Sequence, residues 1–445
     1  MSERLLTGWG RTAATRADVV TIRDVEQVPS LLASAPTRGV VARGLGRSYG
    51  DAAQNAGGRV LDLGRLSLPG TSDRIRLDPS TGVARCAAGV DLGELIGLAL
   101  PQGWFPAVTP GTRSVTVAGA VAADVHGKNH HTDGSIAGYV RALTVVTPSR
   151  GTLRVSASEH PDVFWATVAG MGLTGVVTEV ELALMHAPSA TMSVDTDRCD
   201  TLDTLLETVS AHERRRRYSV AWIDVMSRHG RGVVTSADHA EPGDSAPAGR
   251  TRVPRPRLAV PPRVPAGLLN RSTVAAFNEA WYRRAARHSR SVPQSLWRFF
   301  YPLDGVAEWN RLYGPPGLLQ YQVVVPDDEP LRALLDLLRR HRAPVFLAVL
   351  KTFGEGNAAP LSFPQPGWTL AVDLPRDTPD VDALLGRLDE VTLDAGGRTY
   401  LAKDARVRPE SIPLMYPRLD EWRAVRDSLD PDHVMTSDLS RRLLL

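Results

Sequence analysis

The stretch VTPGTRSVTVAGAVAADVHGKNHH (Val108–His131) combines a proline turn, many small residues and three histidines. From Gly111 to Ala123 the residues are Gly, Ala, Thr, Ser and Val, interrupted only by Arg113. Such small side chains let a backbone lie against a bulky flat ligand with its N–H groups turned inward. The polar residues that follow are expected at the reactive end of that ligand: His126, Lys128, Asn129, His130 and His131.

A second glycine-bearing stretch, VVARGLGRSYGD (Val40–Asp51), lies upstream. A short apolar run leads into Gly44, Gly46 and Gly50, as expected of a turn whose amides hold a pyrophosphate. No Gly-Lys-Ser/Thr follows, which excludes a Walker loop. The third glycine falls one place late for G-x-G-x-x-G, and no helical pattern begins there. A tight turn between strands is the alternative interpretation.

Together, RGLGRSYGDAAQN (Arg43–Asn55) and PGTRSVTVAGAVAADVHGKNHH (Pro110–His131) resemble the FAD domain of the vanillyl-alcohol-oxidase superfamily. Within it they are most similar to the flavin subunits of decaprenylphosphoryl-β-D-ribose 2′-epimerases. The resemblance extends in order through LTGWGRTA (Leu6–Ala13), FWATVAGMGLTGVV (Phe164–Val177), EWNRLYGPPGLLQYQ (Glu308–Gln322), APLSFPQPGW (Ala359–Trp368), AKDAR (Ala402–Arg406) and MYPRLDEW (Met415–Trp422). It therefore spans nearly the whole chain and implies an α+β, two-domain PCMH-type FAD-binding fold.

This resemblance implies FAD-dependent oxidation of the 2′-hydroxyl of decaprenylphosphoryl-β-D-ribose to the 2′-keto sugar. That is the first half of epimerisation to the arabinose lipid used in cell-wall arabinan synthesis. A separate NAD(P)H-dependent keto-reductase subunit is the expected partner. Two alternatives stay open: an FAD oxidase of a soluble sugar, polyol or aldonolactone, and a non-catalytic, flavin-free binding protein of the same fold.

The length and charge of the chain limit the number of domains and the classes of function that it can have. A chain of 445 residues exceeds one typical core and favours two domains. The net charge is only +3 and no basic stripe with interleaved aromatics is present, which argues against nucleic-acid binding. The run Arg214–Arg217 is an exception that we interpret as a solvated helix end. No signal-peptide or membrane-spanning pattern occurs, which favours a cytoplasmic start, but the family's association with the cell envelope leaves export or peripheral membrane contact open.

Hydrophobic periodicity divides the chain into three parts. Residues 1–185 are expected to form the FAD-binding domain, residues 186–398 a substrate domain of antiparallel sheet covered by helices, and residues 399–445 a segment that returns to the first domain. Helices are predicted at Leu92–Leu100, Pro161–Val168, Leu202–His212, Thr273–His288, Glu329–His341, Val381–Asp394 and Glu421–Leu429. Strands are predicted at Val60–Leu63, Gly82–Ala88, Val140–Val146, Thr152–Val155, Val176–Leu184, Tyr218–Asp224, Leu318–Val325, Val345–Lys351 and Trp368–Leu374.

One segment, 236–265, lacks a hydrophobic period and is predicted to be a mobile loop. Its second half, RTRVPRPRLAVPPRVP, is basic and proline-rich. This half is either a site for a lipid phosphate or a membrane surface, or a plain linker.

Oxidation of a sugar hydroxyl by a flavin requires a base and positive charge near N1–C2=O of the ring. Lys403 is the first candidate for either role, since burial of a lysine lowers its pKa; the alternative is a surface lysine paired with Asp404.

His126 is the second candidate, and the resemblance places it near the isoalloxazine ring, with Lys128 in the substrate pocket. A zinc pair of His126 and His130 is disfavoured, because Gly127 makes a poor helix centre and no third ligand is evident, so no metal is expected.

The resemblance extends to a full set of site residues. Those expected to bind FAD are Arg43, Gly44, Leu45, Gly46, Arg47, Ser48, Tyr49, Gly50, Asn55, Pro110, Gly111, Thr112, Val115, Thr116, Gly119, Ala120, Ala123, His126, Gly172, Gly175, Val177 and Tyr400. Those expected to bind substrate are Lys128, Trp222, Gln322, Leu347, Val349, Lys351, Phe353, Thr369, Ala371 and Lys403.

Three departures from the family pattern matter. Many superfamily members attach FAD covalently through a histidine in the glycine loop, but Arg47–Gly50 contains no histidine or cysteine, so FAD is expected to be non-covalent. Ala371 stands where mycobacterial members carry the cysteine attacked by nitroaromatic inhibitors, and Thr369 stands where they carry asparagine. Turnover should survive the loss of a thiol that has no evident part in hydride transfer.

Overall fold

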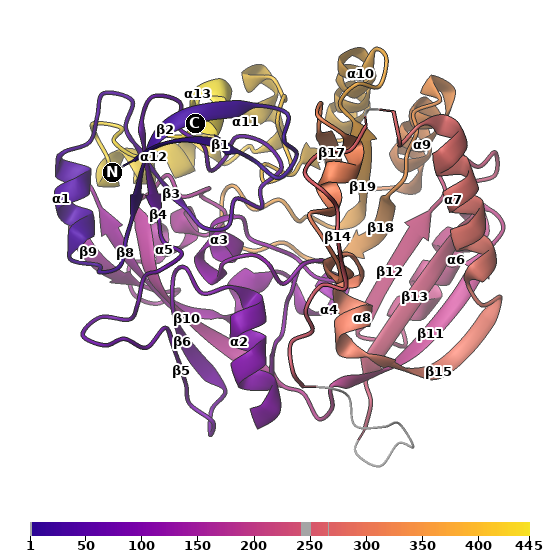
Figure 1. Cartoon of the computed structure of the whole chain (residues 1–445), viewed down its shortest axis with the longest axis horizontal. Coiled ribbons are helices and arrows are strands. Elements are labelled where there is room, and N and C mark those ends of the chain that lie inside the picture. The colour runs from indigo at the N-terminus through magenta and orange to yellow at the C-terminus, as the bar shows by residue number, and fades with distance from the viewer. Residues whose placement is uncertain (1, 242–250, 266) are drawn as a thin grey trace.

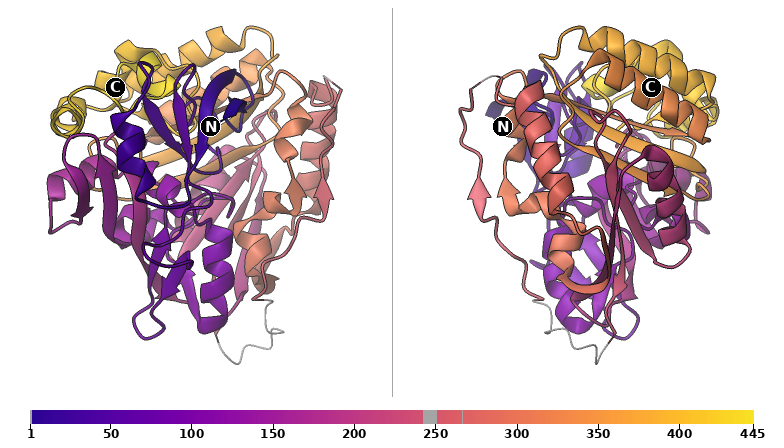
Figure 2. Two further views of the ribbon diagram at one scale, coloured as in Figure 1. Left: turned by 60° about the vertical axis from the view of Figure 1, so that its left-hand side comes forward. Right: turned by 90° about the vertical axis from the view of Figure 1, so that its right-hand side faces the viewer.

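The computed structural model describes residues 2–241, 251–265 and 267–445. The ribbon forms two units side by side, one built from the N-terminal residues and one from the middle of the chain (Figure 1). The last residues lie on the first unit (Figure 1), although the right-hand view of Figure 2 separates the two chain ends. The α+β class predicted from the sequence is confirmed.

The first unit contains two sheets. One has the order β1-β2-β4-β3, and the other has the order β5-β6-β10-β8-β9, with β7 paired to β10. The strands are β1 (Ser2–Thr7), β2 (Ala14–Thr21), β3 (Val40–Arg43), β4 (Arg59–Asp62), β5 (Ile75–Leu77), β6 (Val83–Ala87), β7 (Trp104–Pro106), β8 (Val140–Thr147), β9 (Gly151–Val155) and β10 (Val176–His186). Their helices are α1 (Gln27–Ala33), α2 (Leu92–Ala99), α3 (Val117–Ala122), α4 (His130–Asp133) and α5 (Pro161–Thr167).

The second unit is built on an eight-stranded sheet of order β15-β11-β13-β12-β18-β19-β17-β20, in which the neighbouring strands are antiparallel. The strands are β11 (Thr191–Cys199), β12 (Tyr218–Ile223), β13 (Gly232–His239), β15 (His288–Ser295), β17 (Leu318–Val325), β18 (Ala348–Phe353), β19 (Gly367–Pro375) and β20 (Arg398–Thr399). The helices are α6 (Leu202–Glu213), α7 (Arg271–Arg284), α8 (Leu296–Phe300), α9 (Asp328–His341) and α10 (Val381–Asp394).

Side chains alternate across this sheet, and the alternation creates the two faces that matter for function. On β17, Leu319, Tyr321 and Val323 point into a core shared with α6, α9 and α10, whereas Gln320 and Gln322 lie on the opposite face. Helix α9 fits its side of that core because Leu331, Leu334, Leu335 and Leu338 repeat at helical spacing. One face of the sheet therefore packs against the helices in an apolar core, and the other face can line a cavity.

The C-terminal residues complete the core of the first unit. Helices α11 (Ile412–Met415), α12 (Leu419–Leu429) and α13 (Asp438–Leu443) pack into the same hydrophobic core as the first-unit sheets. Arg442 forms ion pairs of 2.8 Å with both Asp51 and Asp404, which ties this segment to the glycine turn. The return of the chain therefore brings residues near 403 beside residues near 50.

Several boundaries differ from those predicted. The helix expected at Thr273–His288 is α7 and ends at Arg284, because His288–Ser295 pairs with β11 as an edge strand. The loop expected at 236–265 starts later, since Ser236–His239 belongs to β13; residues 242–250 of it lie outside the described residues. Within its second half, β14 (Leu258–Ala259) pairs in parallel with β16 (Val306–Ala307).

The interpretation of Arg214–Arg217 as a solvated helix end is wrong for half of the run. Arg216 forms an ion pair of 2.9 Å with Asp195, and Arg217 forms one of 2.7 Å with Asp133 of α4. Because Asp133 belongs to the first unit, the Arg217 pair joins the two units on the side of the histidine-rich segment.

Candidate active site

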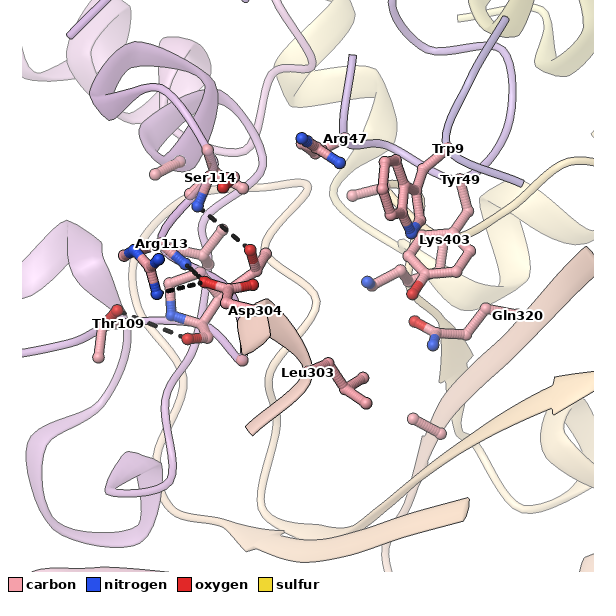
Figure 3. A pocket seen from close by; sticks show the side chains of 18 of the residues that line it. Trp9, Arg47, Tyr49, Thr109, Arg113, Ser114, Leu303, Asp304, Gln320 and Lys403 are labelled. Atoms are coloured by element: carbon pink, nitrogen blue, oxygen red, sulfur yellow. Dashed lines mark hydrogen bonds and ion pairs between the residues drawn. The ribbon is translucent and has the colours of Figure 1, made fainter. Parts of the chain in front are cut away.

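A cavity of about 990 Å³ lies between the two units. This volume is at the upper end of the range of about 300–1,000 Å³ typical of ligand pockets. Its walls come from both glycine-bearing stretches, from the open face of the large sheet and from the C-terminal segment. Figure 3 shows Trp9, Tyr49, Gln320 and Lys403 on one side of the cavity, with Arg113 and Asp304 on the other.

The two glycine-bearing stretches meet at this cavity. Thr116 caps α3, because its hydroxyl oxygen accepts a hydrogen bond from the Gly119 amide (3.2 Å). The same oxygen would lie only 2.3 Å from a Cβ atom placed on Gly44. Only a glycine at position 44 allows that approach. Arg43 stabilises the turn by donating hydrogen bonds to the carbonyls of Ala53 (2.7 Å) and Thr7 (2.8 Å). The sequence-distant turns therefore form one continuous wall.

This wall offers donors that suit an anion. In the described part of the chain, the backbone N–H groups of residues 44–48 have no protein acceptor. Arg47 lies over the Trp9 ring at 4.0 Å, and its buried Nε has no hydrogen-bond partner among the described residues. Burial lowers the pKa of Arg47. Free peptide N–H groups beside an unpaired guanidinium fit the diphosphate of FAD.

Lys403 lies at another part of the wall, where its ammonium group is 4.0 Å from the centre of the Tyr49 ring. Burial lowers its pKa, and the nearby Asp373 carboxylate acts in the opposite direction. Asp373 is fully buried, accepts a 2.5 Å hydrogen bond from Gln320, and its pKa is raised by burial. Asp404, the alternative partner, instead pairs with Arg442, so Lys403 faces the cavity rather than a surface carboxylate.

His126 also lines the cavity and is held as a neutral imidazole. Burial is the main cause that lowers its pKa well below the ordinary value, and Lys351, His130 and Lys403 lower it further. Gln322 donates its amide N–H to Nε2 of His126 (2.9 Å), so the remaining proton belongs on Nδ1, which has no partner in the described residues. A neutral histidine can position groups or donate one hydrogen bond, but it supplies no positive charge.

The open face of the large sheet forms the floor. Gln322, Ala371, Val349, Trp222 and Val233 are successive cross-strand neighbours on five strands, and all five line the cavity. Lys351 and Thr369 form a second cross-strand pair on the same face. The floor changes from polar at Gln322 to apolar at Val233.

Most of the residues expected to bind FAD or substrate line this single cavity, but three do not. Asn55 instead donates to the Gly39 carbonyl (2.9 Å) and accepts from Arg441 (2.8 Å), so it braces the C-terminal helix. A Cβ on Gly50 would lie 2.0 Å from the Asp404 carbonyl, so this glycine allows the C-terminal segment to pack. Phe353 lies behind the wall, with its ring 4.7 Å from that of His126.

The structure also adds residues that the sequence did not single out. Gln320 and Trp9 line the cavity, and Asp304 holds Arg113 through its amide (3.0 Å) and guanidinium (3.3 Å). Gln320 lies two residues before Gln322 on β17, and Asp373 lies two residues after Ala371 on β19. The period of two along a strand was the signal that could have located both.

Comparison with known proteins agrees with this geometry. The family model described as FAD binding domain matches residues 17–156, and that described as D-arabinono-1,4-lactone oxidase matches residues 371–443. A relative named decaprenylphosphoryl-beta-D-ribose oxidase, from Mycolicibacterium smegmatis, is 41% identical over 460 residues, covering 99% of this chain and 97% of its own. The chain therefore belongs to this family of FAD-dependent oxidoreductases.

Two further relatives extend the comparison. An uncharacterized protein from Streptomyces coelicolor is 38% identical over 80% of this chain and all of its own length. The alditol oxidase of a Streptomyces species is 25% identical, with 99% of both chains covered. The FAD expected from the sequence is thus the cofactor of the family, and the free backbone N–H groups of the 44–48 turn are suited to its diphosphate.

Two kinds of feature are absent from the described residues. No helix among them has both the length and the apolar character to cross a bilayer. No group of three or more His, Cys, Asp or Glu side chains within the same residues is arranged to hold a metal ion.

Proposed function

We propose that this protein oxidises the 2′-hydroxyl of decaprenylphosphoryl-β-D-ribose to the 2′-ketone. The C2–H bond breaks with its electron pair, the hydroxyl proton goes to a base, and a C=O bond forms. FAD, when bound, accepts the hydride. The proposal rests chiefly on the relative of 41% identity, together with a cavity that places Lys403 and His126 beside a polar end of the sheet.

We assign the base to Lys403. Its pKa is lowered by burial, so a larger fraction of the amine is neutral near pH 8 than for an exposed lysine. Asp373, held by Gln320, is a carboxyl group near enough to influence this lysine electrostatically. His126 is assigned a positioning role, because its Nε2 is already engaged by Gln322 and its pKa is too low for it to carry charge.

The division of labour between the parts of the chain follows from the same proposal. Residues 1–185 and 399–445 would hold the cofactor and contribute Lys128 and Lys403 to the substrate site, and residues 186–398 would supply the rest of that site. Of the described cavity-lining residues, His126 is the only histidine, and none is a cysteine. Cys86 and Cys199 are both buried and free, and neither lines the cavity.

FAD should therefore be bound without a covalent link. We expect precipitation with acid to leave the yellow colour in the supernatant, because the Arg47–Gly50 turn contains no nucleophilic side chain of the usual attachment type. The measurement is the absorbance spectrum of supernatant and pellet. Flavin retained by the precipitated chain would show that a different residue, with His126 as the first suspect, forms a bond to it.

Two partners belong to the proposal. A separate NAD(P)H-dependent keto-reductase would reduce the 2′-ketone from the opposite face to give the arabinose epimer. Peripheral contact with a membrane would bring the lipid to the cavity, and the exposed arginines of residues 251–263 are suited to anionic headgroups. Arg113 donates to the Pro254 carbonyl (2.7 Å), so this basic segment lies against the cavity rim.

Anaerobic reduction tests the function. The holoenzyme should lose its visible flavin absorbance when mixed with the ribosyl lipid in the absence of oxygen. The match of residues 371–443 to the lactone oxidase family and the similarity to alditol oxidase favour one alternative, oxidation of a soluble sugar, polyol or aldonolactone. Bleaching by such compounds, with none by the ribosyl lipid, would replace the first proposal by the second.

A further inference from the structure

The basic residues of this chain are distributed unusually. The sequence contains 52 lysines and arginines, and only three of them, Lys128, Lys351 and Lys403, are lysines. All three line the same cavity, although they lie on three different segments of the chain. Arginine serves at every other basic position, which indicates that an amine rather than a guanidinium is needed at these three.

Lys128 and Lys351 differ from Lys403 in their surroundings. Lys128 donates to the Phe299 carbonyl, and its ammonium lies 4.4 Å from the centre of the Phe299 ring. Lys351 donates to the Gly127 carbonyl (3.2 Å). Among the described residues, the charged groups that shift the pKa of Lys128 and Lys351 are other lysines, whereas the Asp373 carboxylate raises the pKa of Lys403. The two amines therefore face the cavity without a protein counter-charge.

A buried amine can lose its proton near neutral pH, whereas a guanidinium stays protonated. Burial lowers the pKa of Lys128 to about 7, with Lys351 as the second cause. Burial likewise lowers the pKa of Lys351 to about 7, with Lys403 as the second cause. The charged and titratable groups that face these two amines are each other, Lys403, His126 and His130. Near pH 8 a larger fraction of both amines is therefore neutral than for an exposed lysine, and an entering anion would favour their protonated forms.

The cavity continues from these lysines along an apolar path. Val349, Trp222 and Val233 form the floor on three adjacent strands. Phe277 and Trp281 of α7 stack with their rings 6.1 Å apart and also line the cavity, and Phe346 lies 4.7 Å from Phe277. Phe277 and Trp281 are 40% and 45% exposed, so the aromatic lining reaches the surface of the molecule.

We propose that Lys128 and Lys351 bind the phosphodiester of an isoprenoid-linked sugar, and that the apolar floor beside Trp222 receives the first isoprene units. This inference rests on the proposed function for its choice of an isoprenoid lipid. In a sugar joined to phosphate at C1 and oxidised at C2, the phosphate lies one carbon from the reacting hydroxyl. It must therefore bind next to the base, and Lys351 lies close enough to Lys403 for their charges to interact.

Farnesyl phosphate is the probe that tests the site, because it carries the phosphate and isoprene units but no oxidisable sugar. Its binding to the FAD-loaded enzyme is measured by calorimetry, with inorganic phosphate and farnesol as the two half-ligands. Farnesyl phosphate should bind more tightly than either half. At pH 8 its binding should take up protons, seen as a heat that depends on the ionisation enthalpy of the buffer, and its affinity should fall as the pH rises above 7.

Substitution locates the effect. Lys128→Met and Lys351→Met, which keep most of the apolar stem but remove the amine, should each weaken farnesyl phosphate binding by about 10- to 100-fold, as expected for loss of a charge-assisted contact. Proton uptake should decrease in both, and farnesol binding should stay unchanged. Arg141→Met, at an exposed position on β8 away from the cavity, is the matched control for loss of one positive charge and should bind like the unmodified protein.

The outcomes separate this inference from the proposed function. Unchanged farnesyl phosphate affinity in both lysine variants at full flavin content would overturn the phosphate site even if the ribosyl lipid bleaches the flavin. Lysine-dependent binding of farnesyl phosphate supports the site even if the ribosyl lipid fails to bleach the flavin, in which case only the proposed sugar is wrong. Equal affinity for inorganic phosphate and farnesyl phosphate would overturn the isoprene part.

Discussion

Replacing Lys403 by methionine should slow reduction of the flavin by substrate by about 10²–10⁴-fold, the usual contribution of a general base. Methionine preserves most of the side-chain volume over the Tyr49 ring but has no lone pair that can take the hydroxyl proton. Stopped-flow absorbance under anaerobic conditions measures the step directly. Flavin content, measured separately, should fall much less, because the turn at residues 44–48 supplies the donors proposed for the diphosphate.

The rate of flavin reduction should also depend on pH, in a direction set by the protonation of Lys403. Since burial holds the pKa of Lys403 below its ordinary value of 10.5, the amine loses its proton at a lower pH than an exposed lysine does. The reduction rate of the unmodified enzyme should therefore rise with pH and level off above that lowered pKa. Lys403→Arg, which stays protonated throughout, should be slow at every pH. A variant at position 403 that reduces at the normal rate would remove this lysine from the mechanism.

Replacing Gly44 by valine should abolish stable FAD binding. Its Cβ would lie 2.3 Å from the Thr116 hydroxyl, so the turn and the N-terminal end of α3 would have to separate. The cofactor would then lose donors from both glycine-bearing stretches at once. We expect less than about a tenth of the normal flavin content after purification, since one or two lost charge-assisted contacts already change an affinity by that order.

Gly138→Ala is a control for the loss of a glycine where a side chain has room. A Cβ at this exposed position meets nothing within 4 Å, so flavin content should be unaffected. Circular dichroism of both variants distinguishes loss of cofactor from loss of fold. Normal flavin content in a folded Gly44→Val protein would show that the two stretches do not grip one cofactor.

Sequence periodicity located the elements that are buried on one face, such as α9, α10 and β17, because their apolar residues repeat at a single period. It failed where polar residues fill a strand. β11 reads TMSVDTDRC and β15 reads HSRSVPQS, and their pairing with one another decides their conformation. Edge and near-edge strands of this kind carry little apolar signal, so tertiary pairing overrides local propensity.

The candidate site could be predicted further than propensity alone allows, because the resemblance identified residues from many segments that are far apart in the sequence. It could not separate residues that line the cavity from residues that support it. Asn55 and Phe353 occupy positions of the family pattern, yet their contacts are with Arg441 and His126. That distinction depends on side-chain direction in the folded chain, which no single segment encodes.

The position of Lys403 has a consequence for how the protein is made. The segment that carries this lysine, 399–445, also completes the first unit's core, since Trp422, Leu439 and Leu443 belong to the same buried cluster as Val40 of β3 and Leu61 of β4. A ribosome therefore releases the entire substrate-binding half before the flavin-binding half can close. The nascent chain should remain unable to retain its vitamin-derived cofactor until residues 399–445 have been synthesised, so the cofactor site closes only after the substrate-binding half has been made.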